Sequence, residues 1–226
     1  MTDHRLSAGT DIAEMALFDT EAIPRTHPLN EKGLHELEAS KHLIRLPTGA
    51  DGGYLLHLYI NEFPPEKIMQ YCLTDDKLTG EFSSLGGRIA FGGVESTFQE
   101  FKPNPLIRSD MVIPAGNYAY TAYRTDIPDE IVNEAIQVAS TARERWLDRV
   151  PLMITLATFG IAFGFAAFKN FLAAGIVLVL GHVSFKFVKS LPDQGALAAR
   201  REKAQEDFPS IVIELRANIA VDRNRE

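Results

Sequence analysis

Residues 151–168 read PLMITLATFGIAFGFAAF, and residues 171–185 read FLAAGIVLVLGHVSF, without a single Lys, Arg, Asp or Glu in either stretch. A helix needs about 20 residues to cross the hydrocarbon core of a bilayer, with roughly 17 as the lower limit. The ranges 150–168 and 171–189 meet this length once a few flanking residues are included. They predict a two-helix transmembrane hairpin within residues 149–189. The alternative is a pair of buried helices in a large soluble core.

Basic and aromatic residues flank the predicted spans and indicate their orientation. Only Lys169 lies in the short turn between the spans, whereas their other ends are rich in positive charge. The expected interface anchors are Arg143, Arg145, Trp146, Arg149 and Lys189. Because cytoplasmic loops carry an excess of Lys and Arg, this bias predicts a two-pass protein of a bacterial-type inner membrane with both termini in the cytoplasm. The opening residues, MTDHRLSAGTDIAEM, contain no apolar signal-peptide segment.

The predicted spans contain small and polar residues that indicate helix contacts. Gly160 and Gly164 form a GxxxG step, which allows two helices to approach closely, and Gly175 and Gly181 thin the second span. We expect these glycines to pack within the hairpin, with a homo-oligomer seam as the alternative. His182 and Lys186 lie four residues apart on one helix face. His182 is expected to be a hydrogen-bonded packing residue, and the alternative is a proton path or a contact with another membrane protein.

The residues outside the spans predict an α+β fold, with a small, mostly antiparallel sheet and flanking helices in a soluble domain. Residues 1–50 are expected to be a lead-in with short helices over Asp11–Asp19 and Glu31–Leu46. Residues 51–148 are expected to form an acidic cytosolic α+β domain. Its expected elements are β regions over Tyr54–Phe63, Phe82–Phe101 and Met111–Tyr123 and helices over Glu66–Leu73 and Asp129–Leu147.

The tail, residues 190–226, is expected to be cytosolic and to return to the soluble domain. Ala196–Phe208 has the pattern of a helix, and Pro209 ends it. Every second residue from Ile211 to Val221 is apolar, which is typical of a strand with one buried face. An amphipathic helix over the same residues is the alternative.

No group of residues outside the spans predicts catalysis. His35, Glu38 and His42 would share a face if they lay on one helix, but HELEASKH is not the HExxH zinc motif. A solvated polar face is therefore expected there. Residues 86–93, GGRIAFGG, match neither GxxxxGK[ST] nor GxGxxG, so the two Gly pairs are expected to mark hairpin turns or bulges.

The remaining nucleophilic and titratable side chains are expected to have structural roles. Cys72 is expected to be a buried small hydrophobe, and His57 a half-buried structural histidine. A single cysteine excludes an internal disulfide and a Cys-rich zinc site. No cofactor and no metal is expected. The chain is interpreted as a non-enzyme, with a membrane-anchored enzyme that has an unrecognised site as an alternative.

Charge gives a further functional indication. The chain carries 23 basic and 30 acidic residues, and residues 1–148 alone carry 13 basic and 23 acidic residues, a net charge of −10. An acidic domain argues against nucleic-acid binding and would attract a basic protein partner. Tyr118 and Tyr120 share a strand face and are a candidate recognition surface, with packing in the sheet as the alternative.

These observations predict a non-enzymatic binding protein anchored in the inner membrane. Its most specific form is an immunity-type protein whose cytosolic domain binds and neutralises a toxin at or near the membrane. An acidic domain, the lack of a catalytic motif and a compact anchor motivate this interpretation. The alternative is a ligand-sensing membrane effector whose hairpin oligomerises and permeabilises the membrane, with Gly160, Gly164 and His182 as the candidate residues.

Overall fold

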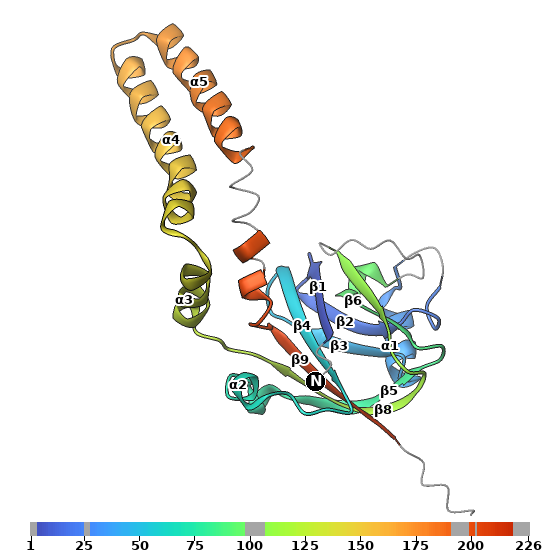
Figure 1. Cartoon of the computed structure of the whole chain (residues 1–226). Coiled ribbons are helices and arrows are strands. Elements are labelled where there is room, and N and C mark those ends of the chain that lie inside the picture. Colours follow the sequence, from blue (N-terminus) through green and yellow to red (C-terminus); the bar gives the residue numbers. More distant parts are fainter. Residues whose placement is uncertain (1–3, 25–27, 98–106, 191–198, 202, 219–226) are drawn as a thin grey trace, which may run out of the picture. The chain divides into compact units, whose positions relative to one another are not determined.

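The computed structural model describes residues 4–24, 28–97, 107–190, 199–201 and 203–218 (Figure 1). The chain divides into two compact units. The first, Met1–Ile127 with Phe208–Glu226, is built mainly from strands, and the second, Pro128–Asp207, is helical. The protein is therefore an α+β protein in which the second unit is an insertion between two segments of the first.

The strands of the first unit form two sheets. The five-stranded sheet has the order β1 (His4–Thr10), β4 (Gly52–Ile60), β9 (Ile211–Ala217), β8 (Gly116–Arg124), β5 (Leu78–Ser84). The four-stranded sheet has the order β3 (Leu43–Pro47), β2 (Glu14–Asp19), β6 (Arg88–Gly93), β7 (Arg108–Val112). Neighbouring strands are antiparallel except for β4 and β9, which are parallel. The prediction of a small, mostly antiparallel sheet is thus right in character, but there are two sheets.

The main hydrophobic core lies between the two sheets, because alternate residues of each strand face inward. Leu17, Phe91 and Ile89 come from the four-stranded sheet, and Leu58 and Ile213 come from the five-stranded sheet. All five side chains are completely buried. Burying an apolar side chain of this size contributes about 1.5–3 kcal/mol, so this layer is the principal source of stability in the first unit.

Short helices cover apolar residues outside this main core. α1 (Glu31–Ala39) places Leu34 against Phe18 and Ala90, which are on the outer face of the four-stranded sheet. The other short helical segments are α2 (Glu66–Met69) and the 3-10 turns η1 (Thr74–Asp76) and η2 (Val94–Ser96). An ion-pair group also fixes α1 to the sheet: Arg45 of β3 donates to both oxygens of Glu14 at 2.6 and 2.7 Å and to Glu31 at 2.5 Å.

The segment after the helical unit forms the central strand of the five-stranded sheet. β9 pairs with β4 on one side and with β8 on the other, so that Ile213 is opposite both Leu58 and Ala122. The alternation of apolar residues from Ile211 correctly predicts this strand, and the amphipathic helix does not form. Residues 219–221 of the predicted strand lie outside the described residues.

Residues 1–50 are not a lead-in: they contribute β1, β2 and β3, and only one of the two predicted short helices, α1, forms. The segment Asp11–Asp19, expected as a helix, contributes β2, in which Met15 and Leu17 face the core while Ala16 and Phe18 face α1. Because β2 is buried on both faces, its apolar residues do not alternate with polar ones, and the helix-like spacing is coincidental. The predicted helix Glu31–Leu46 ends at Ala39.

The first glycine pair of residues 86–93 marks a corner between the two sheets and not a hairpin turn, whereas Gly92 and Gly93 lie within β6 and pair with neighbouring strands of the same sheet. β5 and β6 flank the first pair, yet β5 pairs with β8 and β6 pairs with β2 and β7. Gly87 has a φ of +83°, and a Cβ atom there would lie 2.2 Å from the carbonyl oxygen of Ile113. Only glycine satisfies both conditions at this corner.

The second unit contains α3 (Asp129–Ala139), α4 (Ala142–Ala167) and α5 (Phe171–Lys189). The predicted single helix Asp129–Leu147 is interrupted at Ser140, whose φ and ψ of −103° and 136° are extended. α4 and α5 pack against each other as an antiparallel hairpin (Figure 1). In the turn, Lys169 has a φ of 58° and Asn170 caps α5 by accepting a hydrogen bond from Ala173 N at 3.2 Å. Of the predicted helix Ala196–Phe208, residues 199–201 and 203–205 are helical, and the remainder lies partly outside the described residues.

Candidate functional site

The helical hairpin has an apolar surface along most of its length. Arg149–Ala167 and Phe171–Lys189 are each 19 residues long and apolar enough to cross a membrane. Among the described residues of these two segments, only the small side chains Ala162 and Ala174 are buried, whereas large side chains such as Phe163 and Leu172 are exposed. Soluble proteins rarely expose continuous apolar patches of this size. α4 and α5 are therefore not buried core helices of this chain.

The contact between α4 and α5 is made at a different glycine from those that the GxxxG pattern suggests. A Cβ atom on Gly181 would lie 2.2 Å from Thr158 Oγ1, so the two helices approach most closely here. A Cβ atom on Gly160, Gly164 or Gly175 would meet no atom of the described residues within 4 Å. The expectation that these three glycines pack within the hairpin is wrong, because they lie away from its own seam.

The polar residues of α5 are also on its outer surface. His182 and Lys186 are exposed, and neither lies between the two helices. The Lys189 ammonium lies 5.0 Å from the centre of the Phe185 ring. Of the expected interface anchors, Trp146 is 61% exposed and Arg149 is exposed. Arg143 and Arg145 lie within α4, and their side chains are outside the described part of the structure.

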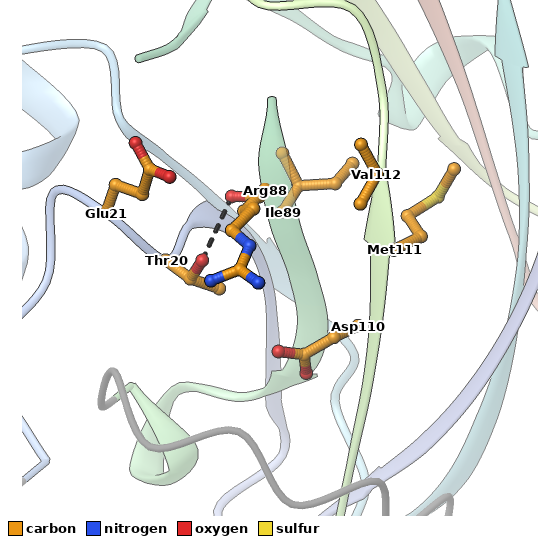
Figure 2. A pocket seen from close by; sticks show the side chains of 7 residues that line it. All are labelled: Thr20, Glu21, Arg88, Ile89, Asp110, Met111 and Val112. Atoms are coloured by element: carbon orange, nitrogen blue, oxygen red, sulfur yellow. Dashed lines mark hydrogen bonds between the residues drawn. The ribbon is translucent and has the colours of Figure 1, made fainter. Parts of the chain in front are cut away.

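The first unit contains a pocket of about 420 Å³ at one end of the four-stranded sheet (Figure 2). It lies where β2 ends, β6 begins and β7 ends, and the register places Ile89 opposite Met111 and Arg88 opposite Val112. Its lining residues are Thr20, Glu21, Arg88, Ile89, Asp110, Met111 and Val112. Its volume is within the range of small-molecule sites, about 300–1,000 Å³. The lining residues combine apolar side chains with charged and hydroxyl groups.

A buried carboxylate fixes the backbone around this pocket. Asp19 is completely buried and accepts hydrogen bonds from Glu21 N at 2.8 Å and from Leu85 N at 2.5 Å. It thereby ties the end of β2 to the glycine corner that precedes β6. His42 Nδ1 lies 2.9 Å from Ser83 O and 3.8 Å from Asp19 Oδ2 on the same side. The backbone of Arg88 is held by a hydrogen bond of 2.9 Å from Thr20 N to its carbonyl oxygen, so neither Glu21 nor Arg88 uses its side chain for these bonds.

The charged groups of the pocket differ in how they are neutralised. Asp110 accepts two hydrogen bonds of 2.6 Å from the buried Arg108 guanidinium, which also lies 5.2 Å from the centre of the Phe18 ring. Arg88 and Glu21 form no ion pair with each other, and neither side chain has an ion pair or hydrogen bond within the described part of the chain. Figure 2 shows the Arg88 side chain between those of Glu21 and Asp110. Within the described ranges, the pocket thus has one unpaired cation and one unpaired anion, and both side chains are exposed to solvent.

Tyr118, predicted to belong to a recognition surface, is buried. This side chain is 2% exposed, belongs to the main core and donates its hydroxyl hydrogen to Pro114 O. Tyr120 is half-buried and packs over Gly80, where a Cβ atom would lie 2.8 Å from the ring. Burial raises the pKa of both phenols. Both tyrosines therefore pack in the sheet, which is the alternative expectation for this pair.

The other candidate residues from the sequence, His35, His42 and Cys72, form ordinary structural contacts. His35 lies on α1 between Glu31 and Glu38, at 3.3 and 3.4 Å, while His42 follows the helix and is not on its face. Across the residues that the structure describes, no group of three or more His, Cys, Asp or Glu side chains is arranged to hold a metal. Cys72 is buried in a cluster with Tyr59 and Val212, as predicted.

His57 is more deeply buried than predicted. It is 1% exposed in β4, and its Nδ1 atom lies 3.4 Å from the hydroxyl of Tyr59. The two rings meet edge to face with their centres 6.3 Å apart. This arrangement is a packed polar pair inside the first unit.

Sequence patterns do not identify the pocket, because its residues come from three segments that are distant along the chain. The glycine-rich segment around Arg88 is the one signal available, since two glycine pairs around a short strand indicate sharp corners. Nothing local connects it to Glu21 or to Asp110. Strand pairing in the four-stranded sheet is what joins them.

Comparison with known proteins gives little further information. No known protein family and no curated protein matches the chain. A solved structure described as crocagin biosynthetic gene J is similar to 55% of this chain and is covered over 79% of its own length, with 12% sequence identity and a TM-score of 0.40. A similarity of this extent assigns neither a fold family nor a function to the chain.

Proposed function

We propose that this protein is a non-enzymatic binding protein anchored in the inner membrane by the α4–α5 hairpin. The observation that carries the proposal is the exposed apolar surface of two 19-residue helices. In water this apolar surface would promote aggregation, whereas in a bilayer the lipid chains would solvate it. Helices suit a bilayer because their backbone hydrogen bonds are made within each segment.

Chain connectivity supports a hairpin with both ends on one side of the membrane. The helical unit leaves the sheet after β8 and returns to it at β9, and these strands are neighbours, with Arg124 opposite Ile211. A sheet cannot be divided by a bilayer, because strand pairing must be continuous. If α4 and α5 both cross, the first unit and both termini therefore lie on the same side. The positive charge that precedes α4 and ends α5 favours the cytoplasm as that side.

Labelling of engineered cysteines tests this arrangement. Lys169→Cys in the turn and Lys67→Cys in the first unit are placed separately in a Cys72→Ala background. An impermeant maleimide added to intact spheroplasts is expected to label Lys169→Cys at once and Lys67→Cys only after lysis. The protein is expected to stay in the pellet after an alkaline carbonate wash. Release by carbonate, or equal labelling of both sites without lysis, would show the anchor proposal to be wrong.

The first unit is the binding part of the proposed protein. It contains 14 basic and 21 acidic residues, a net charge of −7, which favours association with a basic protein. An anchor would hold this acidic unit beside the membrane, where a toxin that attacks the membrane or crosses it must pass. The specific function that we propose is protection of the cell against such a toxin.

Co-expression tests this function directly. The gene next to the one that encodes this chain is expressed under an inducible promoter, with and without the chain. We expect growth to stop without the chain and to continue with it, and we expect added salt to weaken the complex in vitro. A neighbour that is harmless, or one whose toxicity is unchanged by the chain, would contradict the protective function and leave membrane anchoring to be judged by the labelling experiment.

A second candidate function, a membrane effector whose hairpin oligomerises and permeabilises the membrane, is favoured by one observation. Gly160, Gly164 and Gly175 lie away from the hairpin's own seam, and a Cβ atom on any of them would have no described neighbour within 4 Å. Close contact between copies would use such positions. Overproduction of the chain would then depolarise cells, and Gly160→Leu with Gly164→Leu would abolish this. An unchanged membrane potential on overproduction would exclude this candidate.

A further inference from the structure

We propose that the pocket between β2, β6 and β7 binds a small zwitterionic ligand with an α-amino carboxylate, in which the carboxylate pairs with Arg88 and the ammonium with Glu21. The ligand's side chain would lie against Val112, the exposed apolar side chain of the pocket lining. This inference concerns the first unit alone and does not depend on whether the hairpin crosses a membrane.

The first support is the state of the Arg88 guanidinium. Several described cations of the first unit are neutralised by a carboxylate, as in the pairs Lys41–Glu81, Arg45–Glu14, Arg108–Asp110 and Arg124–Asp76. Arg88 has no such partner in the described part of the chain, although two carboxylates line the same pocket. A guanidinium presents two parallel N–H groups that match a carboxylate, so an unpaired one in a pocket wall suits a carboxylate ligand.

The second support is the position of Glu21. A Cβ atom on Gly86 would lie 2.1 Å from Glu21 Oε2, so the Glu21 carboxylate lies directly over this glycine and a side chain there would displace it. The backbone of Glu21 is held by Asp19, as described above. The side chain has no cationic partner among the described residues, and a ligand ammonium would supply one.

The pocket's charges select against a simple anion such as phosphate. Among the described residues that line the pocket, Arg88 is the one unpaired positive charge, Glu21 is negative, and Asp110 is neutralised by Arg108. A doubly charged anion would therefore meet too little positive charge in a unit of net charge −7. A zwitterion matches the separated cation and anion, and both a free amino acid and a dipeptide have this chemistry.

Ligand-detected NMR on the full chain in detergent micelles tests the proposal. The probes are L-leucine, L-phenylalanine and leucyl-leucine, with leucinamide and N-acetyl-leucine as analogues that lack the carboxylate charge and the ammonium charge. We expect at least one zwitterion to bind, and we expect each analogue to bind about tenfold more weakly or not at all, a difference of about 1.4 kcal/mol. A preference for leucine would indicate a free amino acid, and a preference for leucyl-leucine a peptide.

Variants of the pocket complete the test. Arg88→Gln and Glu21→Gln are each expected to weaken binding about tenfold, and Gly86→Ala is expected to weaken it by displacing the Glu21 carboxylate. Lys67→Gln and Glu66→Gln are exposed, lie outside the pocket and serve as matched controls. Thermal unfolding checks that each variant is folded, and Arg88→Met, which also removes the charge, replaces Arg88→Gln if the latter is not.

Three results would overturn the proposal. One is that no zwitterion of the panel binds below about 10 mM, which corresponds to less than about 3 kcal/mol. Another is that N-acetyl-leucine or leucinamide binds as well as leucine. The third is that binding persists unchanged in a folded Arg88 variant. Each of these leaves the carbonate-wash and labelling results unaffected, so failure here is distinguishable from failure of the membrane anchor.

Discussion

Thr158 of α4 lies directly against Gly181 of α5, at a point where any larger residue in place of the glycine would collide with the threonine hydroxyl or methyl group. This pair, and not the GxxxG step, defines the closest approach of the two helices. Helix contact in a lipid environment depends on such small residues, because there is no hydrophobic force between the helices.

Gly181→Ala is therefore expected to destabilise the hairpin by about 1–3 kcal/mol, the usual cost of an overpacked contact. Unfolding of the full chain by sodium dodecyl sulfate in mixed micelles measures this. Gly175→Ala is the matched control and should have little effect, since no described atom would lie within 4 Å of its Cβ. Thr158→Ala in the Gly181→Ala background should restore part of the loss. Equal effects at Gly181 and Gly175 would argue against the seam.

Because β9 is the central strand of its sheet, truncation of one of its buried side chains is expected to lower the stability of the first unit strongly. Ile213 is completely buried between the sheets, so Ile213→Ala should lower the free energy of unfolding of the first unit by about 2–5 kcal/mol. Ile12→Ala, at a position that is 55% exposed, should change it by less than about 0.5 kcal/mol. Urea denaturation followed by circular dichroism compares the two. Similar losses would contradict the placement of β9 in the core.

Replacement of the buried Asp19 is expected to lower the free energy of unfolding, whereas replacement of a surface aspartate is not. Asp19→Asn keeps the shape but replaces one acceptor oxygen with a donor, which leaves either Glu21 N or Leu85 N without its bond. The expected cost is about 1–3 kcal/mol. Asp51→Asn at an exposed turn is the control. Hydrogen exchange at Leu85 should accelerate in Asp19→Asn alone, and unchanged protection there would count against the proposed tie.

Burial raises the pKa of the Cys72 thiol to about 11, which predicts slow alkylation at neutral pH. An ordinary thiol ionises near about 8.5, so at about pH 8 the thiolate fraction of Cys72 should be more than about 100-fold smaller. Maleimide labelling of the native chain should be slow in proportion, compared with Lys67→Cys in a Cys72→Ala background. Rapid labelling under native conditions would show that the thiol is exposed.

The same shift has a consequence for stability. The unfolded thiol ionises first as the pH rises, so the contribution of Cys72 is complete below about pH 8.5 and is lost as the pH approaches 11. Between these limits the wild type should lose stability faster than Cys72→Ala. Parallel pH profiles of the two proteins, measured by urea denaturation, would contradict the raised pKa.

The sequence predicts the helical hairpin and β9 well because their signals are local. The length of an uncharged stretch and the alternation from Ile211 can both be read without knowledge of what lies nearby. It fails at β2, where burial of both faces by distant elements removes the alternation. The two-sheet arrangement is similarly hidden, because the corner at Gly87 is explained by the carbonyl of Ile113, a contact across the fold.

The pocket is the extreme case of the same limitation. Arg88 stands out in its glycine-rich segment, but Glu21 and Asp110 have no local pattern that assigns them to it. The Gly160–Gly164 step shows the opposite error, in which a recognisable motif is present but another glycine makes the contact. Residue types thus indicate what chemistry is available, while the pairing of distant strands and helices decides where it is used.

The place of β9 in the middle of its sheet also imposes an order of events during synthesis. β8 and β4 have no partner on their shared side until β9 leaves the ribosome, by which time α4 and α5 have already been translated. A hairpin that inserts as it is made would therefore enter the bilayer while the first unit is still an incomplete sheet. A ribosome that stalls before Ile211 would leave a chain with two open strand edges, which is the kind of substrate that quality-control proteases remove.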